Sequence, residues 1–217
     1  MVARAGARSR EGRERRRQAV LDVADRMFSE RGYHEVSLDE LAGDAGISKP
    51  GLYAYFGSKE GLYVAALRRA SEGLAARVEE AVAGTAGSPE QRMWRGILAL
   101  LEFIDENRAA WTMLHRERVA GGGRYFEEVD RAHERMAALI SELMAETSTA
   151  RGIAGSALDA AEPLGHAFVG TCESIARWWL DHPEVPRGTV AMHLMNVAWM
   201  GFGDLVEGRM WLPEAGQ

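Results

Sequence analysis

Two short helix patterns separated by a glycine turn occupy residues 37–56, SLDELAGDAGISKPGLYAYF. Ser37 and Glu40 form a capping box, in which the serine hydroxyl accepts from the Glu40 amide and the glutamate reaches back. This box predicts a first short helix. Gly46 then supplies the left-handed backbone of a turn, and Ser48 caps a second short helix. The two helices are expected to end at about Asp44 and Phe56.

The segments on either side are also helical. Upstream, apolar residues recur at helical spacing from Val20 to Phe28, and Gly32 is placed to cap that helix at its C-terminal end. Downstream, Ser58 caps a long helix with apolar residues along one side. A helix, a turn and a second helix between two supporting helices predict a helix-turn-helix, whose second helix enters the major groove of DNA. An ordinary small helical subdomain is the alternative.

The second short helix has side chains suited to DNA. Its lysine and hydroxyl groups can reach phosphates or base edges, and a glycine leaves its surface bare for a close approach. Ser58-Lys59 places a lysine and free backbone amides at a helix N-terminus, which suits a phosphate. The residues selected on this chemistry are Ser48, Lys49, Gly51, Tyr53, Tyr55 and Lys59.

At these residues the sequence resembles the TetR family of transcriptional regulators. The match covers about Arg13 to Leu67, and its most specific part is the Tyr-x-Tyr-Phe-x-x-Lys-Glu run that ends at Glu60. Ser37 stands where threonine is commonest, and Pro50-Gly51 stiffens the start of the recognition helix. The resemblance implies an all-helical fold, a homodimer and a C-terminal effector domain, in a family whose members are usually repressors released from DNA by a small molecule. It assigns phosphate contacts to Ser37, Tyr55 and Lys59, and base-facing roles to Ser48, Lys49, Pro50, Gly51 and Tyr53.

The rest of the chain also predicts helices, so the expected fold class is all-α, with about nine helices. We expect a disordered basic leader at 1–12, a helix-turn-helix DNA-binding domain at 13–60 and a helical effector-binding and dimerisation domain at 61–217. Within the last domain, a break at 84–88 precedes a helix that starts at Pro89, and a joint follows at 107–108. Further helices are expected at about 125–146, 159–181 and 187–211.

The last expected helix is apolar nearly all round, so it must be buried on two sides. One side can meet the chain's own core and the other a second subunit. The preceding helix repeats the pattern, and two helices from each subunit would give a four-helix bundle. A monomer with a thick core is the alternative. The candidate dimer contacts are Phe168, Cys172, Ile175, Trp179, Met195, Trp199 and Phe202.

Methionine and aromatic side chains on several helices could line an adaptable apolar pocket, which predicts an apolar or amphipathic small effector. The alternative for these residues is an ordinary core. His115 could equally be a core histidine, and Glu173 an i, i+4 partner of Arg177. The candidate pocket residues are Met93, Trp94, Leu98, Trp111, Leu114, His115, Met136, Ile140, Glu173 and Trp178.

Charge is divided unevenly along the 217 residues. Residues 1–69 hold 13 Lys and Arg against 10 Asp and Glu, whereas residues 70–217 hold 13 against 22. A basic N-terminal part followed by an acidic remainder suggests two functions, one of which is binding to a polyanion. No apolar segment follows the N-terminal arginines, and the longest uncharged run, at 188–203, has 16 residues. The sequence therefore predicts no signal peptide, no membrane span and a cytoplasmic location.

Enzyme chemistry is not indicated. The sequence has no H-E-x-x-H, G-x-S-x-G or Cys-x-x-Cys motif, and its six histidines lack metal-ligand spacing. The only cysteine, Cys172, lies on an apolar stripe and is expected to be buried, with a thiol redox sensor as the alternative. We predict no catalytic residue, no metal and no cofactor. Two other functions remain open: an activator or constitutive DNA binder of the same fold, and a small-molecule-binding protein or enzyme whose head has lost DNA affinity.

Overall fold

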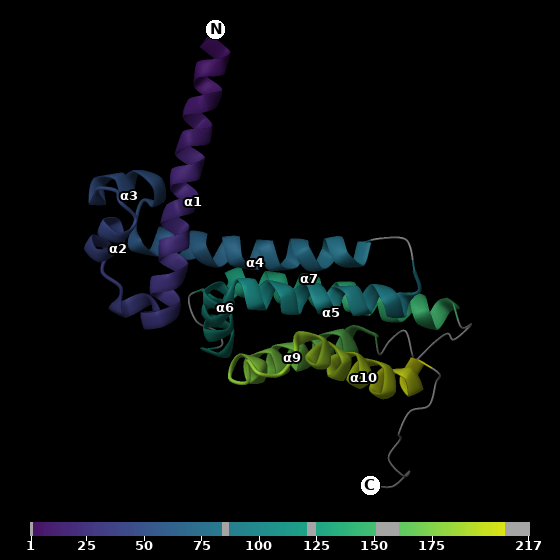
Figure 1. Cartoon of the computed structure of the whole chain (residues 1–217). Helices are drawn as coiled ribbons and strands as arrows, with labels where there is room; N and C mark the ends of the chain where they lie inside the picture. The colour runs from purple at the N-terminus through teal and green to yellow at the C-terminus, as the bar shows by residue number, and fades with distance from the viewer. Residues whose placement is uncertain (1, 84–86, 121–124, 151–160, 207–217) are drawn as a thin grey trace. The chain divides into compact units, whose positions relative to one another are not determined.

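The computed structural model describes residues 2–83, 87–120, 125–150 and 161–206, and the regular structure in these ranges is entirely helical (Figure 1). The nine helices of this described part are α1 (Val2–Glu35), α2 (Leu38–Asp44), α3 (Lys49–Phe56), α4 (Lys59–Ala83), α5 (Pro89–Glu106), α6 (Arg108–Ala120), α7 (Phe126–Ala150), α9 (Ala161–Leu180) and α10 (Arg187–Val206). The predicted all-α fold class is confirmed.

The helices form two compact units. The first comprises Met1–Glu72 and Asn107–Val129, and the second comprises Gly73–Glu106 and Asp130–Gln217. This division differs from the expected domain boundary at residues 60–61, for two physical reasons. The helix α4 is continuous and contributes to both units. The helix α6 belongs to the first unit because it packs against α1.

Apolar side chains at helical spacing build the core of the first unit. Phe28 of α1 and Tyr63 of α4 are completely buried, and their rings meet edge to face with centroids 4.8 Å apart. Leu41 of α2 and Leu52 of α3 are also completely buried, and they hold the two short helices on this core. Arg116 of α6 donates to the carbonyl oxygens of Phe28 (2.9 Å) and Ser29 (2.5 Å) and so satisfies carbonyls near the end of α1.

The helix α1 begins at Val2 and runs through residues that the sequence analysis assigned to a disordered leader. This segment lacks an apolar stripe, so hydrophobic periodicity gives no helix signal there. It nevertheless holds three Ala and three Arg, which have high helix propensity, and it extends a helix that is already nucleated on the core. At the other end, Gly32 leaves the helical conformation with φ 78°, as its assignment as a cap predicts.

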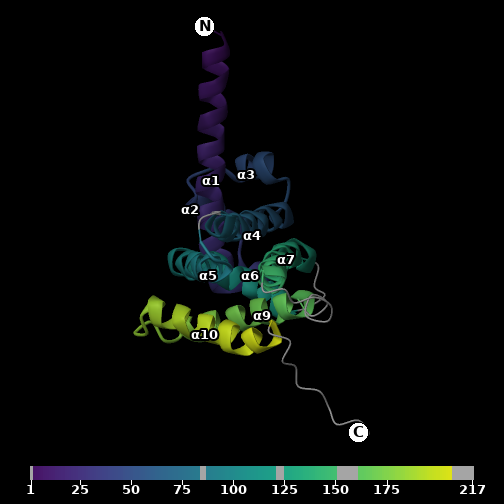
Figure 2. The same cartoon turned by 90° about the vertical axis from the view of Figure 1, so that its right-hand side faces the viewer.

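The second unit contains the remainder of α4 together with α5, α7, α9 and α10. The helix α10 packs against α5 and α9 (Figures 1 and 2). The helices α7 and α9 approach closely at Gly165, where a Cβ atom would lie 2.6 Å from the carbonyl oxygen of Ala137. An ion pair of 2.7 Å joins Arg135 of α7 to Glu79 of α4. None of the helices in the described ranges is long and apolar enough to cross a membrane.

Candidate nucleic-acid interface

The N-terminus of α2 is capped as predicted, with different partners. The Ser37 hydroxyl accepts from the Asp39 amide at 3.2 Å, and the Glu40 carboxylate pairs with Arg31 at 3.0 Å. These two contacts replace the expected ones, in which the Glu40 amide donates to the Ser37 hydroxyl and the Glu40 carboxylate reaches back to the cap. An arginine from α1 offers the carboxylate a charge-assisted partner that no local sequence pattern reveals. The turn after α2 uses Gly46 at φ 63°, as predicted.

The helix α3 has one buried side and one side open to solvent. The Ser48 hydroxyl caps it by accepting from the Gly51 amide at 3.2 Å, and Pro50 lies in its first turn. Gly51 supports this cap, because a Cβ atom there would lie 3.2 Å from the Ser48 oxygen. The predicted contact residues Ser48, Lys49, Pro50 and Tyr53 are all exposed, Tyr53 at 44%. A rigidly held helix therefore presents an ammonium group and hydroxyl groups outward.

Lys49 is already paired within the chain. Its Nζ atom lies 2.8 Å from the Asp39 carboxylate of α2, and both side chains remain exposed. The hydrogen bond and charge of Asp39 raise the pKa of Lys49, so the lysine stays protonated. A DNA phosphate or base that binds Lys49 must compete with this carboxylate.

Tyr55 of α3 and Lys59 of α4 are half-buried and also have partners. The guanidinium of Arg13 lies 5.5 Å from the centre of the Tyr55 ring. The Lys59 ammonium donates to the carbonyl oxygen of His34 at 3.1 Å and lies 4.8 Å from the centre of the Tyr33 ring. An ammonium has three donors, so one hydrogen bond leaves donors for a phosphate. Lys59 therefore also connects the start of α4 to the end of α1.

Gly61 is a positioning residue that the sequence analysis missed. Its amide donates to the Ser58 hydroxyl at 2.9 Å, and a Cβ atom at this position would lie only 2.1 Å from the carbonyl oxygen of Phe56. The close approach of α4 to the end of α3 thus requires glycine. The sequence held one indication of this requirement: Gly61 lies in the first turn of a helix, where glycine lowers helix propensity.

Family models match both parts of the chain. The model of bacterial regulatory proteins of the tetR family matches residues 20–66, and that of the tetracyclin repressor-like C-terminal domain matches residues 89–201. The chain belongs to the TetR family. The predicted resemblance is therefore confirmed, and the protein is a transcriptional regulator with a helix-turn-helix head.

Relatives match along most of the chain. The HTH-type transcriptional activator FasR of Mycolicibacterium smegmatis is 27% identical over 194 residues, covering 89% of this chain and 85% of FasR. A TetR-family regulator from Streptomyces coelicolor is 32% identical, with a TM-score of 0.68 and coverage of 94% of this chain and 92% of its own. A TetR-like regulator from Rhodococcus sp. RHA1 is 29% identical, with a TM-score of 0.73 and coverage of 87% and 96%.

The expected pocket residues are divided between the two units. Trp111, Leu114 and His115 of α6 belong to the first unit. Trp111 and Leu114 are buried, and His115 is half-buried. The rings of Trp111 and His115 stack, with their centroids 6.1 Å apart. The Trp111 indole nitrogen is buried and has no hydrogen-bond partner in the described part of the chain. The seven that belong to the second unit are Met93, Trp94, Leu98, Met136, Ile140, Glu173 and Trp178.

Two pocket candidates in the second unit have partners that the sequence did not predict. Glu173 pairs with the imidazole of His133, 3.1 Å away, and the alternative partner Arg177 is exposed. Trp178 is 43% exposed and stacks on His182, so it does not line an interior wall. On a helix apolar on several sides, sequence spacing does not tell which side faces the core. Met93 and Ile140 are buried, and Trp94, Leu98 and Met136 are half-buried.

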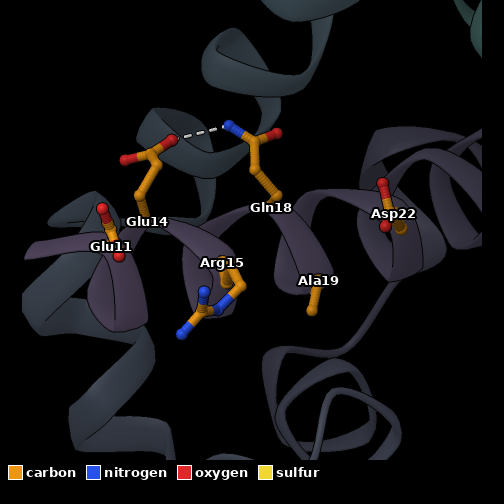
Figure 3. A pocket seen from close by; sticks show the side chains of 6 residues that line it. All are labelled: Glu11, Glu14, Arg15, Gln18, Ala19 and Asp22. Carbon is orange, nitrogen blue, oxygen red and sulfur yellow. Dashed lines mark hydrogen bonds between the residues drawn. The ribbon is translucent and has the colours of Figure 1, made fainter. Parts of the chain in front are cut away.

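A surface pocket lies along α1, and none of the expected effector residues is among those that line it. It is lined by one face of this single helix (Figure 3), and Gln18 donates to Glu14 across it at 2.7 Å. Because every wall belongs to one helix, the pocket is an open depression of the surface that cannot enclose a ligand. The lining residues are Glu11, Glu14, Arg15, Gln18, Ala19 and Asp22.

The expected dimer residues of α9 mostly face inward. Phe168, Cys172 and Trp179 are at most 6% exposed within a single chain, and the Trp179 indole donates to the carbonyl oxygen of Val185 at 2.8 Å. These three cannot present a free apolar surface, and this corrects their assignment. Ile175 and Met195 are half-buried, whereas the side chains of Trp199 and Phe202 lie outside the described residues.

The thiol of Cys172 is buried, and burial raises its pKa. The thiolate that redox chemistry needs is therefore disfavoured, as expected for a buried structural cysteine. Among the described residues, no group of three or more His, Cys, Asp or Glu side chains is placed to hold a metal ion.

Proposed function

We propose that this TetR-family regulator binds an inverted-repeat operator as a homodimer, represses from it, and leaves the DNA when an amphipathic small molecule binds. The outward face of α3 carries this proposal. Leu52 is completely buried and fixes the helix, whereas Lys49 and Tyr53 extend into solvent. A helix held rigidly on its own core, with donors and acceptors outward, meets the requirement for readout in the major groove.

Exposed apolar side chains support the proposed dimer. Trp178 of α9 is 43% exposed, and Met192 and Val197 of α10 are 49% and 48% exposed. Large apolar groups exposed on two helices that pack together favour a protein partner, and a second copy of the chain is the simplest one. In a twofold dimer the two recognition helices could lie about 34–36 Å apart, one helical turn of DNA.

The experiment that tests DNA recognition is selection of bound duplexes from a random pool with the purified full chain. We expect an inverted repeat to be enriched at about physiological salt. Lys49→Ala should alter the enriched sequence, because a base-facing side chain is removed. Weak binding without enrichment would contradict the proposal and would favour a small-molecule-binding protein whose head has lost DNA affinity.

For the effector we propose an acyl thioester of coenzyme A, which is amphipathic. Two regulators that share the fold were solved with such ligands: FadR of Bacillus subtilis with stearoyl-CoA (16% identical, TM-score 0.71) and AibR with isovaleryl coenzyme A and operator DNA (20% identical, TM-score 0.68). Within the second unit of this chain, buried apolar side chains such as Met93 and Ile140 are suitable groups to contact the acyl chain of such a ligand.

A thermal-shift series with acyl-CoAs of increasing chain length tests this effector, with free coenzyme A as the control. We expect the melting temperature to rise with the acyl ligands and the selected operator to be released. A regulator that only binds its effector should also leave the thioester intact. Stabilisation only by small hydrophilic metabolites would contradict an amphipathic effector.

An activator is the second candidate, because the relative FasR, similar over 89% of this chain, is named a transcriptional activator. A reporter gene behind the selected operator distinguishes the two signs of regulation. Lower expression in the presence of the protein supports repression, and higher expression supports activation.

A further inference from the structure

We propose that α1 carries a second DNA-contacting surface, formed by Arg13 and Arg17, which binds backbone phosphates of the operator beside those reached by α3. This proposal rests on the proposed operator binding and extends the interface beyond the residues of the helix-turn-helix. We call Arg13 and Arg17 the α1 arginine face.

The α1 arginine face lies against the C-terminal end of the recognition helix. The Arg13 guanidinium is 5.5 Å from the centre of the Tyr55 ring, and the Arg17 guanidinium is 5.5 Å from the centre of the Phe56 ring. Both helices belong to the first unit, and α1 continues past α3 toward the N-terminus in both views (Figures 1 and 2). DNA bound to α3 would therefore pass close to these cations.

The charges of α1 are separated by face. Arg13 and Arg17 are four residues apart and share one side of the helix, and Arg10 precedes Arg13 by three residues, which is also a helical spacing. The surface pocket on a different side is lined by three carboxylates, Glu11, Glu14 and Asp22, and by one arginine, Arg15 (Figure 3). This separation brings positive charge to the side next to α3, although the chain as a whole has a net charge of −6.

The arginines keep donors available for a phosphate. Contact with an aromatic ring holds the guanidinium plane in place, and its five N–H donors are not consumed by the ring. Arg13 is exposed and makes no ion pair within the described part of the chain, and Arg17 has one loose pair with Glu14 at 3.6 Å. A preoriented guanidinium with free donors matches the geometry of phosphate oxygens.

The test measures the salt dependence of binding to the selected operator by fluorescence anisotropy, using the full chain and the variants Arg13→Gln and Arg17→Gln. Loss of one phosphate contact should lower the slope of log K against log salt by about 0.9, and so by about 1.8 for a dimer. Arg15→Gln is the matched control, because it makes the same change of charge but lies in the surface pocket. Its slope should remain near that of the wild type.

A second measurement separates a DNA contact from simple packing on Tyr55 and Phe56. Duplexes that end at the inverted repeat are compared with duplexes extended by several base pairs on each side. The wild type should gain affinity from the extension, the charge-preserving variant Arg13→Lys should retain most of this gain, and Arg13→Gln should lose it. Salt slopes and extension gains identical for wild type, Arg13→Gln and Arg17→Gln would overturn the proposal. Failure of the wild type to bind any operator would instead overturn the proposed function.

Discussion

At the residue scale, Lys49 shows how an internal ion pair can moderate DNA affinity. We expect Asp39→Asn to strengthen binding to operator and random DNA, because the carboxylate that competes for Lys49 and repels phosphates is removed. The salt slope should rise by up to about 0.9 for each further phosphate that the released lysine neutralises. Anisotropy titrations at several salt concentrations measure both effects.

Asp44→Asn is the control for this change. Asp44 also lies on α2 and pairs with Arg26 at 3.0 Å, so the substitution makes the same change of charge without releasing Lys49. Equal increases in affinity for Asp39→Asn and Asp44→Asn would show that net charge alone is responsible.

Asp25 gives the protein a predicted pH dependence. Burial raises its pKa to about 6, against the lowering effect of its ion pair with Arg69. The unfolded-state pKa is about 3.9, so the folded state binds this proton more tightly. This contribution to stability is fully present below about pH 4 and is lost as pH rises to about 6.

Urea unfolding between pH 4 and pH 7.5 checks this dependence. The part of the pH dependence of the unfolding free energy that comes from Asp25 should disappear in Asp25→Asn, because asparagine does not titrate in this range. Asp22→Asn is the control, because Asp22 pairs with the same Arg69 at 2.7 Å but is 71% exposed, and the buried carboxyl remains. An unchanged pH profile in Asp25→Asn would exclude this assignment.

At the scale of secondary-structure elements, the junction of α3 and α4 depends on Gly61. We expect Gly61→Ala to destabilise the protein by about 1–3 kcal/mol, because the added Cβ would collide with the Phe56 carbonyl oxygen, 2.1 Å away, and push α3 from its position. Operator affinity should fall with it. Chemical denaturation and anisotropy measure the two effects.

Gly43→Ala provides the comparison. Gly43 lies within α2, and an added Cβ would meet no atom within 4 Å. This substitution should stabilise the protein by roughly 0.5–1 kcal/mol, because alanine loses less backbone entropy in a helix. Similar losses of affinity for both variants would argue against a specific role for Gly61.

The boundaries of the short helices could be predicted because the signals are local. Ser48 caps α3 through an amide three residues away, and Gly46 supplies the left-handed backbone of the turn between α2 and α3. The partner of Lys59 could not be predicted in this way, since the His34 carbonyl is 25 residues distant and is brought near only by the packing of α1 and α4. Local chemistry therefore determined the elements, and packing determined many contacts of the site.

At the scale of the whole molecule, the proposed dimer makes a clear prediction. We expect Met192→Glu combined with Val197→Glu to give a monomer, because two charged carboxylates would be desolvated in the interface. Operator affinity should fall strongly, since a single head reaches only one half of the inverted repeat. Light scattering gives the mass in solution.

Tyr53→Glu is the control for association. Tyr53 is a comparably exposed large side chain, at 44%, and it lies on α3. This variant should lose DNA affinity and keep the mass of the wild type. A wild-type chain that is already monomeric would contradict the proposed dimer directly.

The sequence by itself determined the helical class, the helix-turn-helix and the family, because caps, glycine turns and the apolar period act over a few residues. Only the tertiary structure decided which side of α9 is inside, where Phe168 and Trp179 are buried and Trp178 is exposed. It also placed α6 with the head and the α1 arginine face beside α3. These outcomes depend on contacts between residues far apart in sequence, and an apolar or charged pattern on one helix does not specify its partner.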